Sequence, residues 1–287
     1  MTEIIQNQIT SADAWIGSEM QRTDDWVWNL TEEDLSEITG ALAHTKRAGS
    51  KIPFAADAFP LGSFRKKLDK IVGSITHRTF RNNRFEIKGS KNLIDLPETN
   101  VLFVSNHQTY FYDVIAMLHV FNSSVKGRID SVKKPKYLIN PKTNLYYIAS
   151  LETMKKSLIT KLLTYAGAVL VQRSWRDSGE SVSRDIRSED PDKIKLALKD
   201  GWVITFPRGT TDNSKPIRKG TAHIIKSNNP LVVPIKISGF KSVFQRNGLR
   251  VINTKKSFSI EIMKPLRKDI NKNSIDNITI QLEKIID

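Results

Sequence analysis

Short apolar runs alternate with segments of helical spacing along the chain beyond residue 85. The clearest run is 101–104, whose β-branched residues and Phe103 indicate a buried strand. Strands that alternate with helices form a sheet covered by those helices. The pattern therefore predicts an α/β fold with a mixed, largely parallel sheet. The expected strands are 85–88, 100–104, 136–139, 168–172, 202–206, 231–237 and 258–263, and the expected helices are 113–121, 158–165, 190–199, 221–226 and 275–286.

Residues 64–85 form a basic amphipathic segment ahead of the first strand. A basic amphipathic helix is typical of a protein that binds an anionic membrane surface. The same pattern fits a helix that packs on the domain and leaves its charged face in water, and both interpretations stay open. The apolar positions of the segment are Phe64, Leu68, Ile71, Val72 and Ile75.

Charge changes sign near residue 60. Residues 1–60 carry a net charge of −6, although the whole chain of 287 residues carries +15. We interpret 1–60 as an acidic, mainly helical appendage, 61–85 as a basic connector and 86–287 as the main domain. The basic main domain implies partners of opposite sign: nucleic acid, anionic lipid or phosphorylated substrates. Because no nucleic-acid motif with interleaved aromatic residues is present, nucleic acid is not expected.

The composition excludes some kinds of site. The chain has no cysteine, which rules out disulfides, thiolate metal sites and cysteine nucleophiles. No window approaches the roughly 20 apolar residues that a membrane-spanning helix needs. The first residues also lack the basic start and apolar core of a signal peptide, so none is expected. Contact with a membrane is therefore expected to be peripheral.

A candidate general base follows the central strand. The strand 101–104 stops at Ser105 and Asn106, and His107 comes next, six positions before Asp113. An imidazole can accept a proton near neutral pH, and a neighbouring carboxylate can fix its tautomer and stabilise the imidazolium. The alternative is a loop histidine beside an aspartate that caps a helix for purely structural reasons.

Three later stretches add polar groups at strand ends. The strand at 167–173 ends in Arg173, the strand before 206–210 ends in a Pro/Gly turn, and the run 231–235 contains a proline that suits a strand end or edge. Because the carboxyl ends of parallel strands meet at one rim, His107, Arg173 and Gly209 are expected to share a site. An arginine there can bind phosphate through two hydrogen bonds.

In order and spacing, these stretches resemble the glycerolipid acyltransferases, the lysophosphatidate acyltransferase family, over residues 86–265. The family's first block is Asn-His, four residues and Asp; its second is an arginine after a Gly-led strand; its third is Phe-Pro-Glu-Gly-Thr; and its fourth is a Val-Pro-Ile strand. The matching residues here are Asn106, His107 and Asp113, then Gly167 and Arg173, then Phe206, Pro207, Gly209 and Thr210, and finally Val233, Pro234 and Ile235.

The resemblance implies a transferase of lipid metabolism, acting in phospholipid biosynthesis at the cytoplasmic face of a membrane. His107, held by Asp113, would deprotonate the hydroxyl of a lysophosphatidate-like acceptor, which would attack the thioester of acyl-coenzyme A or acyl-carrier protein. Backbone N–H groups near Gly209 would stabilise the oxyanion. No metal or cofactor is implied beyond this acyl co-substrate. The implied substrate-binding residues are Asn106, Arg173, Arg208, Gly209, Thr210, Arg218 and Lys219.

Two departures from the family pattern support a different hypothesis. Five residues, not four, separate His107 from Asp113, and Arg208 stands where the family has glutamate. Arg208 could bind phosphate or be a surface arginine in a tolerant turn. The chain could thus also be a catalytically impaired acyltransferase fold that acts as a basic module for binding anionic lipid or nucleic acid.

A second, weaker resemblance covers residues 24–75, which are similar to the opening of the taurine-type α-ketoglutarate-dependent dioxygenases. Those enzymes bind iron through two histidines and one carboxylate, with a His-X-Asp pair. The chain contains no His-X-Asp. An iron oxygenase is therefore a third hypothesis, and a fragment of that fold without its chemistry is the alternative.

The remaining histidines are expected to be structural. His119 lies on an apolar helix and is expected in the core, whereas His44 and His77 are expected at the surface. His223 falls in the helix after Gly220, where it is either structural or in contact with substrate.

Overall fold

The computed structural model describes residues 61–154, 166–172, 176–177, 180–181, 189–246 and 250–286. The predicted appendage at 1–60, most of the stretch that resembles the dioxygenases, the predicted helix at 158–165 and Arg173 lie outside the described residues.

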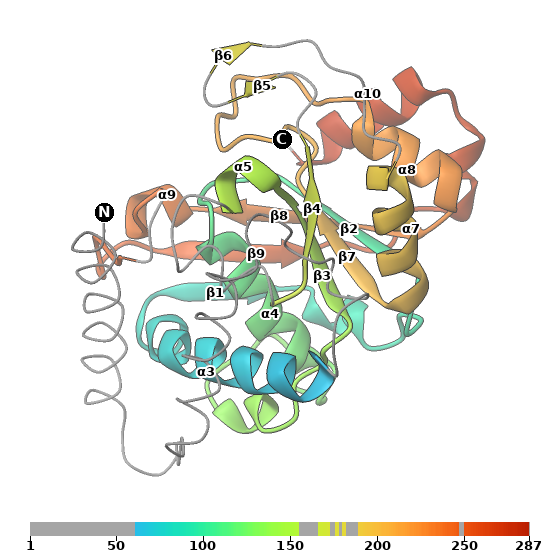
Figure 1. The fold of residues 1–287 in the computed structure, drawn as a ribbon. Helices are drawn as coiled ribbons and strands as arrows, with labels where there is room; N and C mark the ends of the chain where they lie inside the picture. Colours follow the sequence, from blue (N-terminus) through green and yellow to red (C-terminus); the bar gives the residue numbers. More distant parts are fainter. Residues whose placement is uncertain are drawn as a thin grey trace, which may run out of the picture.

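The described chain contains a seven-stranded sheet in the order β1-β9-β8-β2-β7-β3-β4. Each neighbouring pair is parallel except β8 and β9, which are antiparallel. The predicted mixed, largely parallel sheet is therefore confirmed (Figure 1). The strands are β1 (Phe85–Lys88), β2 (Val101–Ser105), β3 (Leu145–Ser150), β4 (Ala168–Val171), β7 (Trp202–Thr205), β8 (Leu231–Ser238) and β9 (Phe258–Ile262), and a separate small hairpin pairs β5 (Arg176–Asp177) with β6 (Glu180–Ser181).

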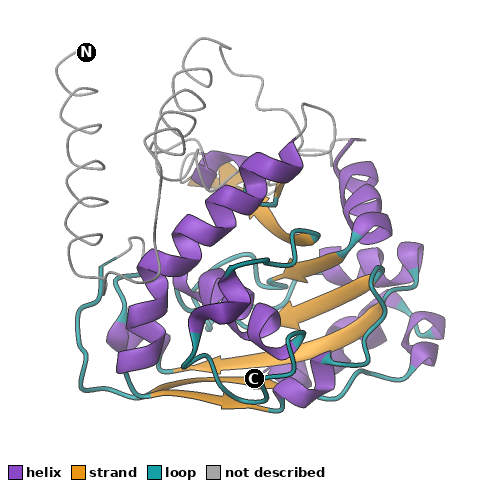
Figure 2. Ribbon diagram, turned by 90° about the horizontal axis from the view of Figure 1, so that it is seen from below, coloured by secondary structure: helices purple, strands orange, loops and turns teal. Residues whose placement is uncertain are grey.

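Helices cover both faces of the sheet (Figures 1 and 2). Along β2, Val101 and Phe103 pack toward one face, and Leu102 and Val104 pack toward the other. Burial on both faces explains why this strand is an uninterrupted apolar run. The first face is covered by α3 (Leu61–Asn82) and α4 (Tyr112–Ser124), and the second by α7 (Glu189–Asp200), α8 (Gly220–Asn228) and α10 (Ile275–Ile286). Shorter helical segments are η1 (Ser90–Leu93), η2 (Pro135–Leu138), α5 (Leu151–Met154), α9 (Phe240–Val243) and η3 (Lys268–Lys272).

The strand predicted at 136–139 is wrong, and β3 was not anticipated. Residues Pro135–Leu138 form the 3₁₀ helix η2, with proline at its start, where the missing N–H and the fixed φ suit a helical turn. The strand begins later, at Leu145, where two tyrosines and Ile148 supply strong β-formers.

Pro234 lies inside β8 rather than at a strand end or sheet edge. On one side it pairs with Val104 of β2. On the other side the ladder with β9 begins one residue later, at Ile235 and Ile262. On this side the carbonyl of Pro234 still accepts the N–H of Met263 at 3.0 Å, so the strand loses only the N–H that proline lacks, at the end of the β8–β9 ladder.

The helix α3 packs on α4 and η2 and buries Leu68, Ile71 and Phe80. This arrangement favours the interpretation of residues 64–85 as a helix that belongs to the domain. The prediction that His77 is exposed is wrong: its side chain is buried and its Nε2 lies 2.7 Å from the carbonyl oxygen of Val132. No helix in the described part of the chain has the length and apolar content needed to cross a membrane.

The prediction that His119 is a core residue is confirmed. It is buried, and both ring nitrogens have partners at 2.8 Å: Nε2 beside the hydroxyl of Thr76 and Nδ1 beside that of Tyr137. Thr76 donates its own proton to the carbonyl of Val72, so it accepts from Nε2, and Tyr137 donates to Nδ1. Burial lowers the pKa of His119 to about 3, which keeps the ring neutral.

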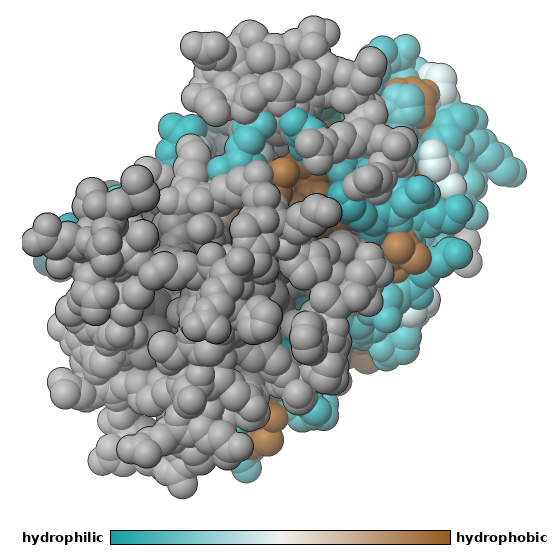
Figure 3. Space-filling view, viewed as in Figure 1, coloured by the Kyte–Doolittle hydropathy of each residue, from teal (hydrophilic) through white to brown (hydrophobic). Residues whose placement is uncertain are grey.

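The outer surface around α7, α8 and α10 is mostly hydrophilic, with scattered apolar positions (Figure 3). Isolated apolar side chains such as Leu196 are ordinary on a soluble surface.

Candidate active site

Two neighbouring strands bring the candidate residues together. His107 follows the carboxyl end of β2, and Phe206 follows the carboxyl end of β7. The strands are parallel, with Val104 opposite Thr205, so the residues just beyond them meet at one rim. The rings of His107 and Phe206 are stacked with their centroids 4.0 Å apart. Phe206 therefore supplies a flat apolar wall that fixes the orientation of the imidazole.

The structure places His107 in direct contact with Asp113. Nδ1 of His107 lies 2.8 Å from Oδ2 of Asp113, whose side chain is fully buried. The carboxylate also accepts hydrogen bonds from the backbone N–H groups of Gln108 and Thr109 and from the Thr109 hydroxyl. A carboxylate only accepts, so Nδ1 carries the proton and Nε2 keeps its lone pair. This arrangement suits a general base.

The extra residue between His107 and Asp113 does not separate them. Phe111 precedes α4 with non-helical backbone angles, and Asp113 lies in the first turn of the helix. The Thr109 hydroxyl donates to Asp113 at 2.6 Å, and this bond closes the longer loop. A spacer of five residues is thus compatible with the contact that the family's four residues would make.

Asn106 and Gln108 fasten the histidine loop to β8. The amide of Asn106 donates to the carbonyl of Ile237 at 2.9 Å and accepts its N–H at 2.8 Å. Gln108 donates to the same carbonyl and accepts the N–H of Phe240. The resemblance implied that Asn106 binds substrate, but both of its amide atoms are used in bracing β2 against β8. Gln108 was missed, because a glutamine after a histidine carries no motif of its own.

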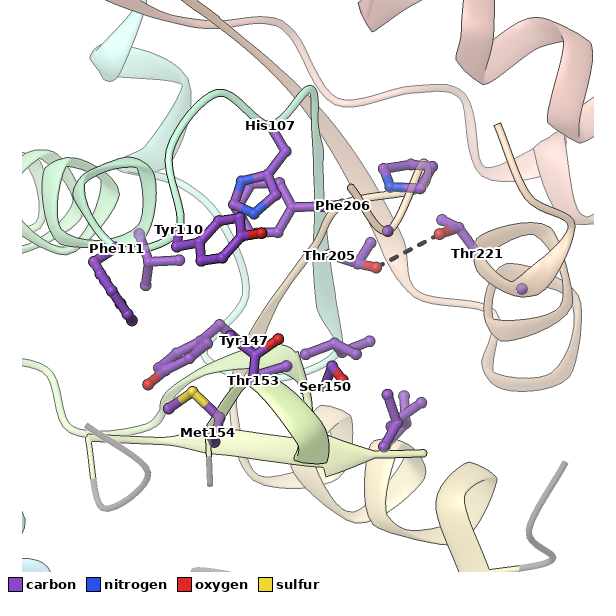
Figure 4. Close-up of a pocket in the computed structure, with 18 of the residues that line it drawn as sticks. His107, Tyr110, Phe111, Tyr147, Ser150, Thr153, Met154, Thr205, Phe206 and Thr221 are labelled. Carbon is purple, nitrogen blue, oxygen red and sulfur yellow. Dashed lines mark hydrogen bonds between the residues drawn. The ribbon is translucent and has the colours of Figure 1, made fainter. Parts of the chain in front are cut away.

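A cavity of about 1190 Å³ opens beside His107. Figure 4 shows His107, Tyr110 and Phe206 on one side and Tyr147, Ser150, Thr153 and Met154, from β3 and α5, on the other. Its lining on α4 runs from Val114 to Asn122, a length of about 12 Å at about 1.5 Å per residue. Apolar residues that line it along this length include Val114, Leu118, Leu138, Ile148 and Met154.

Basic side chains gather at the β7–α8 side of this cavity. Lys215, Arg218 and Lys219 all line it. Lys219 also lies 2.6 Å from Asp276, but both side chains are exposed, and such pairs add little stability. Arg218 and Lys219, which the resemblance implies as substrate-binding residues, are thus on the cavity wall. His223 of α8 also lines the cavity and is exposed.

Arg208 has contacts of a different kind from those expected. Its side chain is 5% exposed, Nε donates to the carbonyl of Lys215 at 2.7 Å, and Nη2 lies 3.7 Å from Glu283 of α10. It is not among the described residues that line the cavity. These contacts tie the turn after β7 to α10, so the arginine in place of the family's glutamate is placed to hold the turn rather than a phosphate. The surface-arginine alternative is wrong as well.

The turn at Gly209 needs glycine, since its φ of 61° lies in the left-handed region that side chains disfavour. Its N–H donates to the carbonyl of Phe206 at 2.9 Å, so this particular N–H is used inside the turn. Thr210 lines the cavity, and its hydroxyl accepts the N–H of Asp212. The N–H of Gly209 itself is therefore not free to stabilise an oxyanion.

Among the cavity residues that sequence reasoning missed are two charged residues outside the four blocks. Asp69 of α3 lines the cavity, and burial raises its pKa to about 7 although Arg65, 3.7 Å away, opposes the shift. Arg65 also donates to the carbonyl of Leu145, the first residue of β3, so this pair lies toward the opposite end of the strand from Ser150. The signal in the sequence was an Arg–Asp pair at i, i+4. The second missed residue is Arg246, which lies beyond the four blocks.

Comparison with known proteins agrees with the fold and the blocks. Residues 84–238 match the family model described as Acyltransferase. The chain is also similar to a crystal structure of the 1-acyl-sn-glycerophosphate (LPA) acyltransferase PlsC from Thermotoga maritima, with a TM-score of 0.53 and 17% identity over 86% of this chain and 85% of that one. At that identity the likeness shows a shared fold. No curated protein matches the sequence significantly. Because the family model spans more than half of the chain, the chain belongs to the acyltransferase family.

Proposed function

We propose that the protein transfers a fatty acyl group from acyl-coenzyme A or acyl-carrier protein to the hydroxyl of a lysophosphatidate-like acceptor, a step of phospholipid biosynthesis. The observation that carries the proposal is the contact of 2.8 Å between His107 and Asp113 on the wall of a long, largely apolar cavity. The similar solved structure is named as an enzyme that acts on such an acceptor, which supports the choice of substrate class.

The chemistry follows from the arrangement of the pair. Nε2 of His107 takes the proton of the acceptor hydroxyl as its oxygen attacks the thioester carbonyl. The tetrahedral intermediate then expels the thiolate, which receives that proton from the imidazolium. Asp113 holds the tautomer of His107 and stabilises the imidazolium. The acyl group moves in one displacement, and the reaction needs no resident metal or cofactor.

Each part of the cavity suits one part of the substrates. The largely apolar wall along α4 and β3 offers about 12 Å of contact for an acyl chain. Lys215, Arg218 and Lys219 can neutralise the acceptor phosphate. The acceptor hydroxyl would then lie between the phosphate and the thioester, within reach of His107.

The two departures from the family pattern are compatible with activity. The longer spacer leaves the contact between His107 and Asp113 in place, and Arg208 is used in bracing the turn. The hypothesis of an impaired binding module loses its specific support from these positions.

We also propose peripheral attachment to an anionic membrane at its cytoplasmic face. Exposed Ile129 and Ile139 stand beside basic residues in the segment between α4 and β3. A few exposed apolar side chains among lysines are typical of proteins that bind an anionic lipid surface. The exposed lysines of this segment are Lys126, Lys133, Lys134 and Lys136.

Product analysis tests the proposed reaction. Purified protein is incubated with a labelled acyl thioester of coenzyme A or acyl-carrier protein and a panel of lysolipids, and lipid products are separated. We expect label to move to a lysolipid that carries a phosphate monoester and a free hydroxyl. Transfer to no member of the panel from either donor would contradict the proposal. For the binding-module alternative, liposome flotation against a gel shift with DNA and RNA separates anionic lipid from nucleic acid as the ligand.

A further inference from the structure

Beyond the residues matched by the family model, residues 244–246 and 250–251 pair as a short antiparallel arm beside the site, which we call the hairpin. It begins after α9, and Phe244 and Val251 form an antiparallel bridge at its base. The N–H of Gln245 donates to the carbonyl of Arg250 at 2.9 Å. The ring of Phe244 is buried and stacks on Tyr112, the first residue of α4, with centroids 3.9 Å apart. The hairpin is therefore fixed to the helix that carries Asp113.

Arg246 of this hairpin contacts the two loops of the site. Its carbonyl accepts the N–H of Tyr110, which lies in the loop between His107 and Asp113, at 2.8 Å. Its Nε donates to the buried hydroxyl of Thr211 at 2.6 Å, in the turn that follows Gly209. One residue from outside the four blocks thus contacts both loops.

The position of the guanidinium favours anion binding. Arg246 lines the same cavity as His107 and Thr210. A guanidinium has five N–H donors, and the bond from Nε to Thr211 restrains its plane while the terminal nitrogens extend beyond that contact. A planar donor fork held in advance suits two-point binding of a phosphate and loses little entropy when the ligand arrives.

The charges around it are mainly positive. Lys215 lines the cavity beside this turn, and Lys241 lies on α9, just before the hairpin. The acidic group nearby is Asp212; hydrogen bonds from Ser214 and the proximity of both lysines lower its pKa, so it is ionised at neutral pH. Two lysines and Arg246 leave a net positive charge at this rim.

We propose that Arg246 is a substrate-binding residue that holds a phosphate group beside His107. The proposal rests on the proposed function for the identity of the ligand. The phosphate belongs either to the acceptor or to the coenzyme A or phosphopantetheine arm of the donor. In both cases the bound group is a phosphate ester, which would lie beside the turn after β7.

Substitution separates this role from loop bracing, because the contact to Tyr110 uses the backbone and survives any change of side chain. Arg246→Gln removes the charge, and Arg246→Lys keeps the charge without the planar fork. Arg250→Gln, an exposed arginine on the same hairpin, is the matched control. We expect Arg246→Gln to raise KM for one substrate by about tenfold, the scale of a lost charge-assisted hydrogen bond, with kcat little changed.

The substrate whose KM rises identifies the source of the phosphate. Arg246→Lys should lie between wild type and Arg246→Gln, and Arg250→Gln should match wild type. Unchanged KM values for both substrates in Arg246→Gln would overturn the proposal. A fall in kcat and in melting temperature with both KM values unchanged would also overturn it, because it would assign Arg246 to structure alone.

A binding measurement keeps this test independent of turnover. Calorimetry compares coenzyme A with pantetheine, and lysophosphatidate with monoacylglycerol, for wild type and Arg246→Gln. In one of the two pairs, we expect the wild-type protein to bind the phosphate-bearing ligand more tightly than its phosphate-free counterpart. Arg246→Gln should lose most of that difference in affinity. If no thioester is consumed but this difference persists, the proposed function fails while Arg246 remains a phosphate-binding residue. The same preference in both proteins would refute the role of Arg246.

Discussion

Two of the histidines that line the cavity, His107 and His119, use their ring nitrogens in opposite ways. His107 gives one nitrogen to the buried carboxylate of Asp113 and has its Nε2 available, whereas His119 gives one nitrogen to Thr76 and the other to Tyr137. Only His107 has a partner that stabilises an imidazolium. An imidazole can act as a base only if one nitrogen is accessible and the protonated ring is supported, so residue type and location in a cavity are insufficient.

The largest expected effect is on activity, from His107→Ala. Without the base, the acceptor hydroxyl keeps its proton, so acyl transfer should fall by a factor of about 10³ or more. The rate of lipid product formation measures this loss. Circular dichroism and the melting temperature should match wild type, because His107 lies in a loop at the rim of the sheet.

A slightly smaller loss is expected from Asp113→Asn. The amide can still accept from the loop N–H groups, but its NH₂ group facing Nδ1 would favour the wrong tautomer of His107. We expect kcat to fall by about 10² to 10⁴, with KM for both substrates changed little. Wild-type kcat in this variant would show that Asp113 only caps α4.

Asp69 extends the comparison to a third ionisable group in the cavity. Burial raises its pKa to about 7, so the folded protein binds a proton that the unfolded chain releases near pH 4. The contribution of this group to stability is therefore lost as pH rises from about 4 to about 7, by about 2–4 kcal/mol.

Urea unfolding of wild type and Asp69→Asn at pH 5 and pH 8 measures that effect. Stability should fall less between the two pH values in the variant than in wild type. Asp95→Asn, at an exposed aspartate, should keep the wild-type dependence. Equal pH dependence in wild type and Asp69→Asn would show that Asp69 is ionised in the folded protein throughout.

The smallest effect is expected from Tyr137→Phe. It removes the donor to Nδ1 of His119 and leaves a buried nitrogen without its hydrogen bond, which should cost about 1–2 kcal/mol of unfolding free energy. Activity per folded molecule should stay within about twofold of wild type. A strong loss of kcat at unchanged stability would mean that the His119 cluster takes part in the reaction.

The secondary structure could be predicted where the pattern of apolar residues fitted only one kind of element. The last helix, Ile275–Ile286, has the predicted bounds because its apolar stripe is complete, and β2 was clear because both of its faces are buried. The segment around η2 was mistaken for a strand, since its aromatic and aliphatic residues are buried in a helical turn set by Pro135. Tertiary packing decides such short apolar segments.

The site could be predicted only where its residues are close in sequence. His107 and Asp113 lie on one loop, so their contact is local. Arg246 reaches the site through Thr211 and Tyr110, and Asp69 reaches it through the packing of α3, contacts that no sequence spacing encodes. Arg208 was misjudged because its partners, Lys215 and Glu283, become neighbours only in the folded chain.

The most direct test measures acceptor-dependent release of thiol from the acyl thioester by His107→Ala and Tyr137→Phe side by side. If His107 is the general base, the first variant loses this release and the second retains it. Release that persists in His107→Ala, at a rate comparable with wild type, would contradict the assignment of His107 as the base.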